Sequence, residues 1–482
     1  MRAFLSSSIG VACAAALVLP LSMPSGAVAA PQDARAGTSV PGSTESLPLV
    51  PLGSDRSSGV ATEQGLPERD VQPFSLVGVV WDDADAELHG SVQVRNRSAE
   101  TGTWSGWQNL ETHNAEHGAD LGTSERDSGT VRGSTAPLWV GASDGVQVRV
   151  RADDDDPDAD PAHASLPRGL SLELVDPGEA PEQLPVTGTD ASRGQAVATD
   201  PDLTETDDDT DDGAVTETDD DTATDTDDDT ATDTDDGIGV DTEDSAATDT
   251  DDDTVTETDD GAVTETEDGT VTDTGVAAKP YTAPRPKIIS RKGWGANEKL
   301  REKQFGYTKT VKAAFVHHSA TGNNYTCKQA PSVIRGIYRY HVTSSGWRDI
   351  GYNFAIDKCG NIYEGRAGGV TKPVMGAHTL GFNTNTTGIA VLGSYSSTNP
   401  PAAVTRAVAK LSAWKLGLHG INPRGKVTLT SGGSNKYKKG RKVSMNAVSG
   451  HRDGFVTDCP GNKLYSKLGS VRVSAAKYQG RS

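Results

Sequence analysis

One stretch of this chain cannot form a compact structure by itself. Residues 200–274 contain 33 Asp or Glu and no Lys or Arg, arranged in repeating Thr-Asp and Thr-Glu units with few apolar residues. Like charges repel one another, and too little apolar surface is present to offset the chain entropy that folding removes. We therefore predict that a longer polar segment around this stretch, residues 178–282, is a disordered acidic linker between folded regions.

The aspartate runs also suggest calcium ligands. Calcium-binding loops need a Gly-turned geometry such as D-x-D-x-D-G, and calcium-binding solenoids carry a strict glycine-rich period. The Thr-Asp repeats match neither pattern. A solvated spacer is therefore the interpretation that we adopt.

The first residues have the features of a secretory signal. Residues 1–29 contain Arg2, an apolar run over residues 9–21 and the small-residue sequence A-V-A at their end, which is typical of a cleaved signal peptide. The apolar run, about 13 residues, is too short to span a bilayer. No similar run follows. We predict a secreted protein without a transmembrane segment.

The charge changes sign after the acidic segment. Residues 279–482 contain 33 Lys or Arg against 7 Asp or Glu, a net charge of +26, although the whole chain carries −23. Such a region is attracted to polyanions. Nucleic acid is excluded as a partner, because no helix-turn-helix or zinc-finger pattern is present and the protein is expected to be exported.

Composition divides the chain into five regions. They are a signal peptide (1–29), a disordered leader rich in Pro, Gly, Ser and Thr (30–66), a β-rich domain (67–177), the acidic linker (178–282) and a second folded domain (283–482). The β-rich domain has short β-branched runs separated by Gly, Asp and Ser turns, which is typical of an antiparallel sandwich. In one run, Val146, Val148 and Val150 alternate with polar residues and should share a face.

The second domain interleaves strand and helix patterns. Buried strands are expected at 313–319 and 387–395, a hairpin at 353–365, and helices at 330–342, 402–418 and 462–478. This order predicts a domain with a central mixed β-sheet flanked by helices.

Two short motifs in the β-rich domain match catalytic signatures without the context that those signatures need. Ser143 lies in a G-x-S-x-G sequence, but a strand pattern follows where a helix is required, so we expect a hairpin turn. His113, Glu116 and His117 form an H-x-x-E-H sequence, but no apolar stripe supports a helix there. We predict a surface loop.

Three residues of the second domain carry metal chemistry. His317 follows a buried strand, and His451 precedes Cys459 by eight residues. Two imidazoles and a thiolate are ligands that zinc prefers, and three protein ligands leave a fourth position for water. The cysteines by themselves leave this open, because Cys327, Cys359 and Cys459 remain after signal removal and allow three choices of pair.

The second domain resembles the type 2 N-acetylmuramoyl-L-alanine amidases, the family that includes the peptidoglycan recognition proteins. The resemblance covers residues 289–478 and is carried by six blocks in the family's order: RKGWGANE, FVHHSAT, GWRDIGYNF, YEGRAGG, MGAHTLGFNTNTTGIAVLG and SGHRDGFVTDCPG. The β-rich domain resembles modules that precede amidase domains in some actinobacterial exported proteins.

This resemblance implies a set of site residues. His317, His451 and Cys459 match the family's zinc ligands, Tyr352 matches its catalytic tyrosine, and Thr457 matches a catalytic position two residues before the cysteine. A branch that uses an aspartate as third ligand makes Asp458 a rival to Cys459. His378 and Arg366 are candidates for contacting substrate carboxylates or sugar, and a structural role is an equal alternative for both.

The resemblance also bears on the disulfide. Family members from animals pair two cysteines that are close in sequence, whereas here only Cys327 lies in the corresponding loop. With Cys459 as a zinc ligand, Cys359 is its remaining partner.

The implied function is zinc-dependent hydrolysis of the amide between N-acetylmuramic acid and L-alanine in peptidoglycan. The alternatives are a recognition module that binds peptidoglycan without cutting it and a wall-associated adhesin with the acidic segment as its stalk. The presence of Cys459 and Tyr352 favours the enzyme. A monomer is expected, although the sequence leaves the oligomeric state open.

Overall fold

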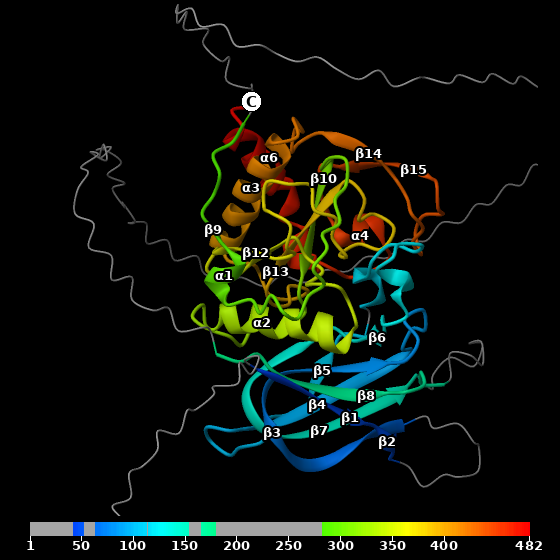
Figure 1. Ribbon diagram of the computed structural model, residues 1–482. Helices are drawn as coiled ribbons and strands as arrows, with labels where there is room; N and C mark the ends of the chain where they lie inside the picture. The colour runs from blue at the N-terminus through cyan, green and yellow to red at the C-terminus, as the bar shows by residue number, and fades with distance from the viewer. Residues whose placement is uncertain (1–41, 53–62, 113, 154–164, 180–281) are drawn as a thin grey trace, which may run out of the picture. The chain divides into compact units, whose positions relative to one another are not determined.

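The structure is a computed structural model that describes residues 42–52, 63–112, 114–153, 165–179 and 282–482 (Figure 1). The predicted signal peptide, the linker segment 180–281 and His113 lie outside these residues. The described residues belong to one compact unit that contains both a β domain and an α/β domain. None of its helices is long and apolar enough to cross a membrane.

The β domain, as predicted, consists of antiparallel strands. Its strands are β1 (Ser43–Pro48), β2 (Val50–Pro51), β3 (Glu63–Trp81), β4 (Gly90–Ser98), β5 (Gln108–Leu110), β6 (Gly133–Ser134), β7 (Leu138–Ala152) and β8 (Ser171–Asp176), with two short 3-10 helices, η1 (Ala115–His117) and η2 (Arg126–Ser128). The order is β1-β8-β3-β7-β4-β5, and β2 and β6 also pair with β3. Irregularities in the β3–β7 register bend the two long strands.

Two details differ from expectation. Part of the predicted disordered leader forms β1, which pairs with β8; the pattern hid it because this edge strand is mostly exposed and has no apolar alternation. Ser143 lies within the continuous strand β7 rather than in a hairpin turn. It is buried, and its hydroxyl accepts a 2.8 Å hydrogen bond from Asn96 Nδ2. Its surroundings are structural, as the absence of a following helix indicated.

The α/β domain has a six-stranded sheet of order β16-β10-β13-β11-β12-β9. Its strands are β9 (Ile288–Ile289), β10 (Ala313–His318), β11 (Phe354–Ile356), β12 (Ile362–Glu364), β13 (Thr386–Val391) and β16 (Val448–Gly450), with a separate pair β14 (Lys426–Thr430) and β15 (Lys442–Asn446). Its helices are α1 (Arg291–Trp294), α2 (Ala330–Arg339), η3 (Tyr340–Ser344), α3 (Ala402–Gly417), α4 (His451–Gly454), α5 (Asn462–Tyr465) and α6 (Leu468–Tyr478). The sheet is mixed, as predicted, because only the β11–β12 hairpin is antiparallel.

Both faces of this sheet are covered. Ile389 and Val391 of β13 pack into a core with α3 and α6, whereas Ala390 between them packs into the core of α2. A strand buried on both faces reads as a continuous apolar run, which is why β10 and β13 were visible in the sequence.

Helix α2 also joins the two domains. Leu76 and Val80 of β3 lie in one apolar core with Val333 and Ile337 of α2. At the start of η3, directly after α2, the Tyr340 hydroxyl donates to the Val79 carbonyl oxygen at 3.3 Å and to that of Thr135 at 3.1 Å. The β domain is therefore packed on the α/β domain through a shared core rather than held only by the linker.

The predicted disulfide between Cys327 and Cys359 is confirmed. It ties the loop before α2 to the β11–β12 hairpin. Cys459 is the remaining cysteine of the described residues, and it is free and buried.

A substitution in β3 tests the shared core. Leu76→Ala should lower the unfolding free energy by about 2–5 kcal/mol and accelerate amide exchange in α2, because the cavity lies against that helix. Val77→Ala is the matched control, since Val77 packs into the β domain's own core. Urea unfolding and hydrogen exchange check this. Equal α2 exchange in both variants would contradict the shared core.

Candidate metal centre

Two histidines meet at the carboxyl ends of neighbouring strands. In the parallel pair β10–β16, Val316 lies opposite Gly450. His317 is the next residue of β10, and His451 directly follows β16 as the first residue of α4. The parallel register therefore brings them side by side, with ring centroids 4.6 Å apart. Both are fully buried. This edge of an α/β sheet is where ligands usually bind.

Cys459 completes the predicted group. It follows α4 in a turn in which the Arg452 amide donates to the Cys459 carbonyl oxygen at 3.0 Å. Its Sγ is 3.8 Å from His317 Nδ1. Asp458, the rival ligand, is exposed and does not belong to this cluster, so its backbone position next to Cys459 does not make it a ligand here.

A fourth donor comes from the β domain. His117, in η1, places its Nε2 3.7 Å from Cys459 Sγ, and its ring centroid is 4.5 Å from that of His451. One ligand atom from each of His117, His317, His451 and Cys459 lies within 4.8 Å of the others. The four residues form a single buried cluster, which we call the metal cluster.

The predicted surface loop around Glu116 and His117 is therefore wrong. Only 3% of Glu116 and 5% of His117 is exposed. This segment has no apolar stripe because it is buried through polar contacts with the α/β domain and not against its own sheet. The H-x-x-E-H spacing was the signal available. Its second histidine, His117, joins the cluster, and its first, His113, lies outside the described residues.

The cluster has the chemistry of a zinc site. A sulfur and a nitrogen bound tetrahedrally to one zinc lie about 3.6 Å apart, close to the two separations found here. Burial lowers the pKa of His117 to about 3 and those of His317 and His451 well below the usual range. The imidazoles are thus neutral, which is the form that binds metal.

Unpaired polar atoms support the same reading. Neither ring nitrogen of His451 has a hydrogen-bond partner among the described residues. Buried polar atoms without partners are costly. A metal ion would satisfy one of the two His451 nitrogens, so the residues present fit the group.

His378 supports His317 from behind. Its Nδ1 is 3.3 Å from His317 Nε2 and 3.0 Å from the Thr379 hydroxyl. This contact leaves His317 Nδ1 turned toward Cys459. A partner that holds the second ring nitrogen in this way is typical of histidines that bind metal. His378 is fully buried in this form of the chain, and the contacts described here are those of a residue that positions His317.

Tyr352 lies beside the cluster. Its ring centroid is 5.5 Å from that of His317 and 5.9 Å from that of His117. Burial, followed by the nearby Cys459 and Glu116, raises its pKa well above the usual value. Tyr352 therefore holds its phenolic proton at any physiological pH and can donate it in a hydrogen bond.

Thr457 faces the β domain. Its hydroxyl donates a 2.9 Å hydrogen bond to Glu116 Oε1 and accepts one of 3.2 Å from the Cys459 amide. Burial raises the pKa of Glu116 to about 7. The side chain that the family resemblance assigns to catalysis is thus paired with a buried carboxyl group of the other domain.

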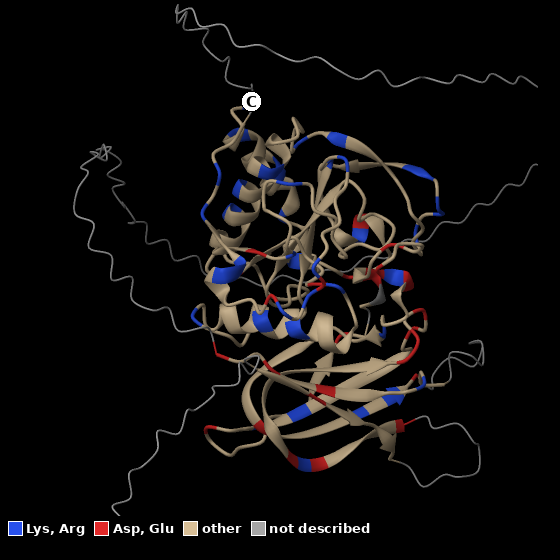
Figure 2. Cartoon of the chain, viewed as in Figure 1, with Lys and Arg blue, Asp and Glu red and all other residues tan. Residues whose placement is uncertain are grey.

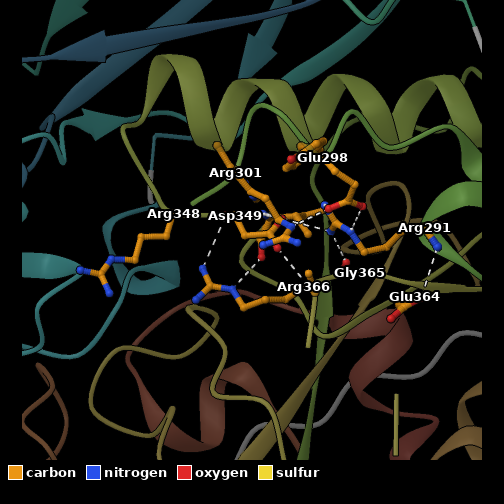
Figure 3. A network of polar contacts seen from close by, with 12 residues as sticks. Arg291, Glu298, Arg301, Arg348, Asp349, Glu364, Gly365 and Arg366 are labelled. Atoms are coloured by element: carbon orange, nitrogen blue, oxygen red, sulfur yellow. Dashed lines mark hydrogen bonds and ion pairs between the residues drawn. The ribbon is translucent and has the colours of Figure 1, made fainter. Parts of the chain in front are cut away.

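Arg366 is paired in the same way. Its guanidinium donates two 2.8 Å hydrogen bonds to the carboxylate of Glu125 and one of 2.9 Å to the Ile350 carbonyl oxygen. Figure 3 shows Arg366 next to Asp349, which also pairs with Arg291. Arg366 is almost fully buried, and its donors face the β domain.

Comparisons with known proteins agree with this architecture. Residues 307–462 match the family described as N-acetylmuramoyl-L-alanine amidase, and residues 31–168 match the family described as Rv3811 N-terminal galactose-binding domain-like. Peptidoglycan-recognition protein SC2 of Drosophila melanogaster is 32% identical over 184 residues, which is 38% of this chain and 84% of that protein. The chain belongs to the N-acetylmuramoyl-L-alanine amidase and peptidoglycan recognition protein family.

Two further relatives are a protein named as an amidase and a recognition protein solved with a bound peptidoglycan fragment. The human N-acetylmuramoyl-L-alanine amidase is 31% identical over 192 residues, 38% of this chain and 28% of that protein. The solved structure of peptidoglycan recognition protein-LE in complex with tracheal cytotoxin, a monomeric diaminopimelic acid-type peptidoglycan, is 29% identical and has a TM-score of 0.29, covering 38% of this chain and 92% of that one.

The amidase match does not include the fourth donor. His117 lies in the region matched by the other family, outside residues 307–462. The amidase motifs therefore contain three members of the cluster, and the β domain contributes the fourth.

Removal of the Glu125 carboxylate tests the buried ion pair. Glu125→Gln should lower the unfolding free energy by about 3–5 kcal/mol, because it leaves the Arg366 charge buried without a partner. Glu68→Gln is the control, since Glu68 forms an exposed pair with Arg95 and should cost less than about 1 kcal/mol. Urea unfolding measures both.

The same pair predicts a pH dependence. Burial opposes ionisation of Glu125, but the Arg366 charge outweighs it and holds the pKa of Glu125 below the usual value. This stabilisation is complete above the unfolded-state pKa and is lost as pH falls through the folded-state pKa. The stability difference between the native chain and Glu125→Gln should therefore shrink in acid, and a constant difference would contradict this.

Proposed function

We propose that this protein is a secreted, zinc-dependent N-acetylmuramoyl-L-alanine amidase that hydrolyses the amide between N-acetylmuramic acid and L-alanine. The observation that carries the proposal is the convergence of His317, His451 and Cys459 at the carboxyl ends of β10 and β16, beside the Tyr352 phenol. The relationship to proteins named as amidases supports it.

In this proposal, His317, His451 and Cys459 hold zinc in the active enzyme. When bound, zinc polarises the scissile carbonyl and activates a water. His378 keeps the His317 ring oriented through the contact between their ring nitrogens. Tyr352 donates its phenolic proton in a hydrogen bond to the carbonyl oxygen as negative charge develops there. Thr457, whose hydroxyl accepts a hydrogen bond from the Cys459 amide, assists beside the cluster.

Peptidoglycan as substrate agrees with the charge of the domain. Lys and Arg outnumber Asp and Glu over the α/β domain (Figure 2). Stem peptides and wall polymers are anionic, so this charge holds the enzyme near its substrate. Arg366 can bind a substrate carboxylate once Glu125 leaves it.

Export is supported by the disulfide as well as by the signal-like sequence. Disulfides persist in oxidising compartments and are rare in the cytosol. The Cys327–Cys359 bond therefore agrees with secretion.

The assay for this function uses the full chain with both Glu116 and His117 replaced by alanine, because these side chains cover Thr457 and the cluster. Incubated with zinc and peptidoglycan, this variant should release new L-alanine amino groups, identified by N-terminal labelling and mass spectrometry. A chelator should abolish the release. Adding Cys459→Ser to the same variant is the matched control and should be inactive.

Binding of peptidoglycan by the zinc-loaded variant without any new amine would overturn the enzyme proposal. The chain would then be a recognition module, the alternative that keeps the ligands without the reaction.

Tyr352→Phe tests the hydrogen bond to the oxyanion. In the same background it should lower kcat about 10²–10³-fold while KM changes little, because the lost interaction forms mainly in the transition state. Steady-state kinetics on a soluble muropeptide measure both constants. A rise in KM with unchanged kcat would assign Tyr352 to ground-state binding instead.

A further inference from the structure

We propose that His117 is the fourth ligand of the zinc in the intact chain, and that the segment carrying it, residues 114–125, keeps the amidase site closed. We call residues 114–125 the latch. The inference rests on the proposed zinc site and adds a regulated state to it: a closed form in which the β domain occupies the position that water and substrate need.

The ligand count carries the first step. Catalytic zinc sites have three protein ligands and an open position, whereas sites with four protein ligands are closed and structural. His117 Nε2 lies as close to Cys459 Sγ as His317 Nδ1 does, at 3.7 and 3.8 Å. The ring also contacts Tyr352. His117 therefore takes the fourth ligand position of the cluster and also lies beside the Tyr352 ring.

Backbone contacts hold the latch on both sides of His117. The Leu380 amide donates to the Glu116 carbonyl oxygen at 2.8 Å. Asn383 Nδ2 donates to the Gly118 carbonyl oxygen at 3.0 Å and to Asp120 Oδ1 at 2.7 Å. These bonds fix the latch to the loop before β13 independently of any metal.

Side chains of the latch also occupy the proposed substrate contacts. Glu116 accepts from the Thr457 hydroxyl, and Glu125 accepts from both Nη1 and Nη2 of Arg366. One short segment thus supplies an imidazole to the fourth ligand position, one carboxyl group to a catalytic side chain and another to a carboxylate-binding side chain. A segment that packed there without a specific role would not be expected to engage all three positions.

The β domain presents the latch rigidly. Asn114 Nδ2 donates to the Ser134 hydroxyl at 3.0 Å, and the Ala136 amide donates to the Glu111 carbonyl oxygen at 2.9 Å. These partners lie at β6 and just beyond it, next to the core that β3 shares with α2. Opening the site therefore requires the latch to separate from the α/β domain or the β domain to move with it.

The closed site is tested without any activity measurement. Co²⁺ binds the same nitrogen and sulfur ligands as zinc and reports its ligands by visible absorption. In the full chain loaded with Co²⁺, azide should leave the spectrum unchanged, because no position is open. In His117→Ala, azide should shift the spectrum in a saturable way. Zinc affinity, measured by chelator competition, should also fall in His117→Ala. Loss of an outer-shell partner lowers metal affinity about 10–100-fold, and loss of a ligand should cost at least as much.

Two variants separate ligation from packing. His117→Cys supplies another ligand, so it should stay closed to azide and show increased thiolate-to-Co²⁺ charge transfer. His89→Ala, a partly exposed histidine of the same domain, should behave as the native chain does. Equal azide binding and equal zinc affinity in the native chain and His117→Ala would overturn the proposal, even if His117→Ala is less stable.

Activity then distinguishes this inference from the proposed function. If both hold, His117→Ala should exceed the native chain in amide hydrolysis by at least about tenfold, because the native chain must first populate an open state. If azide binds as expected but no variant hydrolyses the amide, the closed site is supported and the amidase proposal is overturned. Lower activity in His117→Ala than in the native chain would overturn the latch and make His117 part of the catalytic machinery.

Discussion

The packing of one helix between two sheets is the constraint on which the rest of the structure depends. Helix α2 covers the α/β sheet and also completes an apolar core with β3 and β7 of the β domain. Even a glycine of β3 takes part, because a Cβ at Gly78 would lie 2.4 Å from the Tyr340 hydroxyl oxygen. With the domains in such close contact, a loop that leaves the β domain can reach a defined point on its neighbour and hold one side chain there.

The metal cluster shows how secondary structure can position a site before any metal is present. The parallel register of β10 and β16 sets His317 beside His451, and the turn after α4 returns Cys459 to the same edge. His378 fixes the ring of His317 from the buried side. His317, His451 and Cys459 come from one domain and are positioned by its sheet and by the turn after α4. The fourth, His117, depends on the contact between domains, so the same cluster combines a permanent part with a removable one.

Much of this fold could be predicted from the sequence. Strands β10 and β13 were found because burial on both faces makes them apolar runs, and the hairpin of β11 and β12 because its turn contains Gly360 and Asn361. The disulfide followed from assigning Cys459 to metal. The edge strand β1 was missed because its exposed side chains leave no periodic pattern. Glu116 and His117 were placed on a surface because sequence periodicity reports burial within an element's own domain and carries no information about burial against another.

The burial of Cys459 matters if the protein is exported as we propose. An odd thiol in an oxidising compartment is usually a liability, since it forms mixed disulfides or is oxidised through sulfenic to sulfonic acid. Only 1% of Cys459 is exposed, and the imidazole of His117 lies against its sulfur. Small oxidants and foreign disulfides meet the latch before they meet the thiol. The closed form that we propose would therefore also be a storage form, in which a zinc ligand sensitive to oxidation stays intact until the site opens.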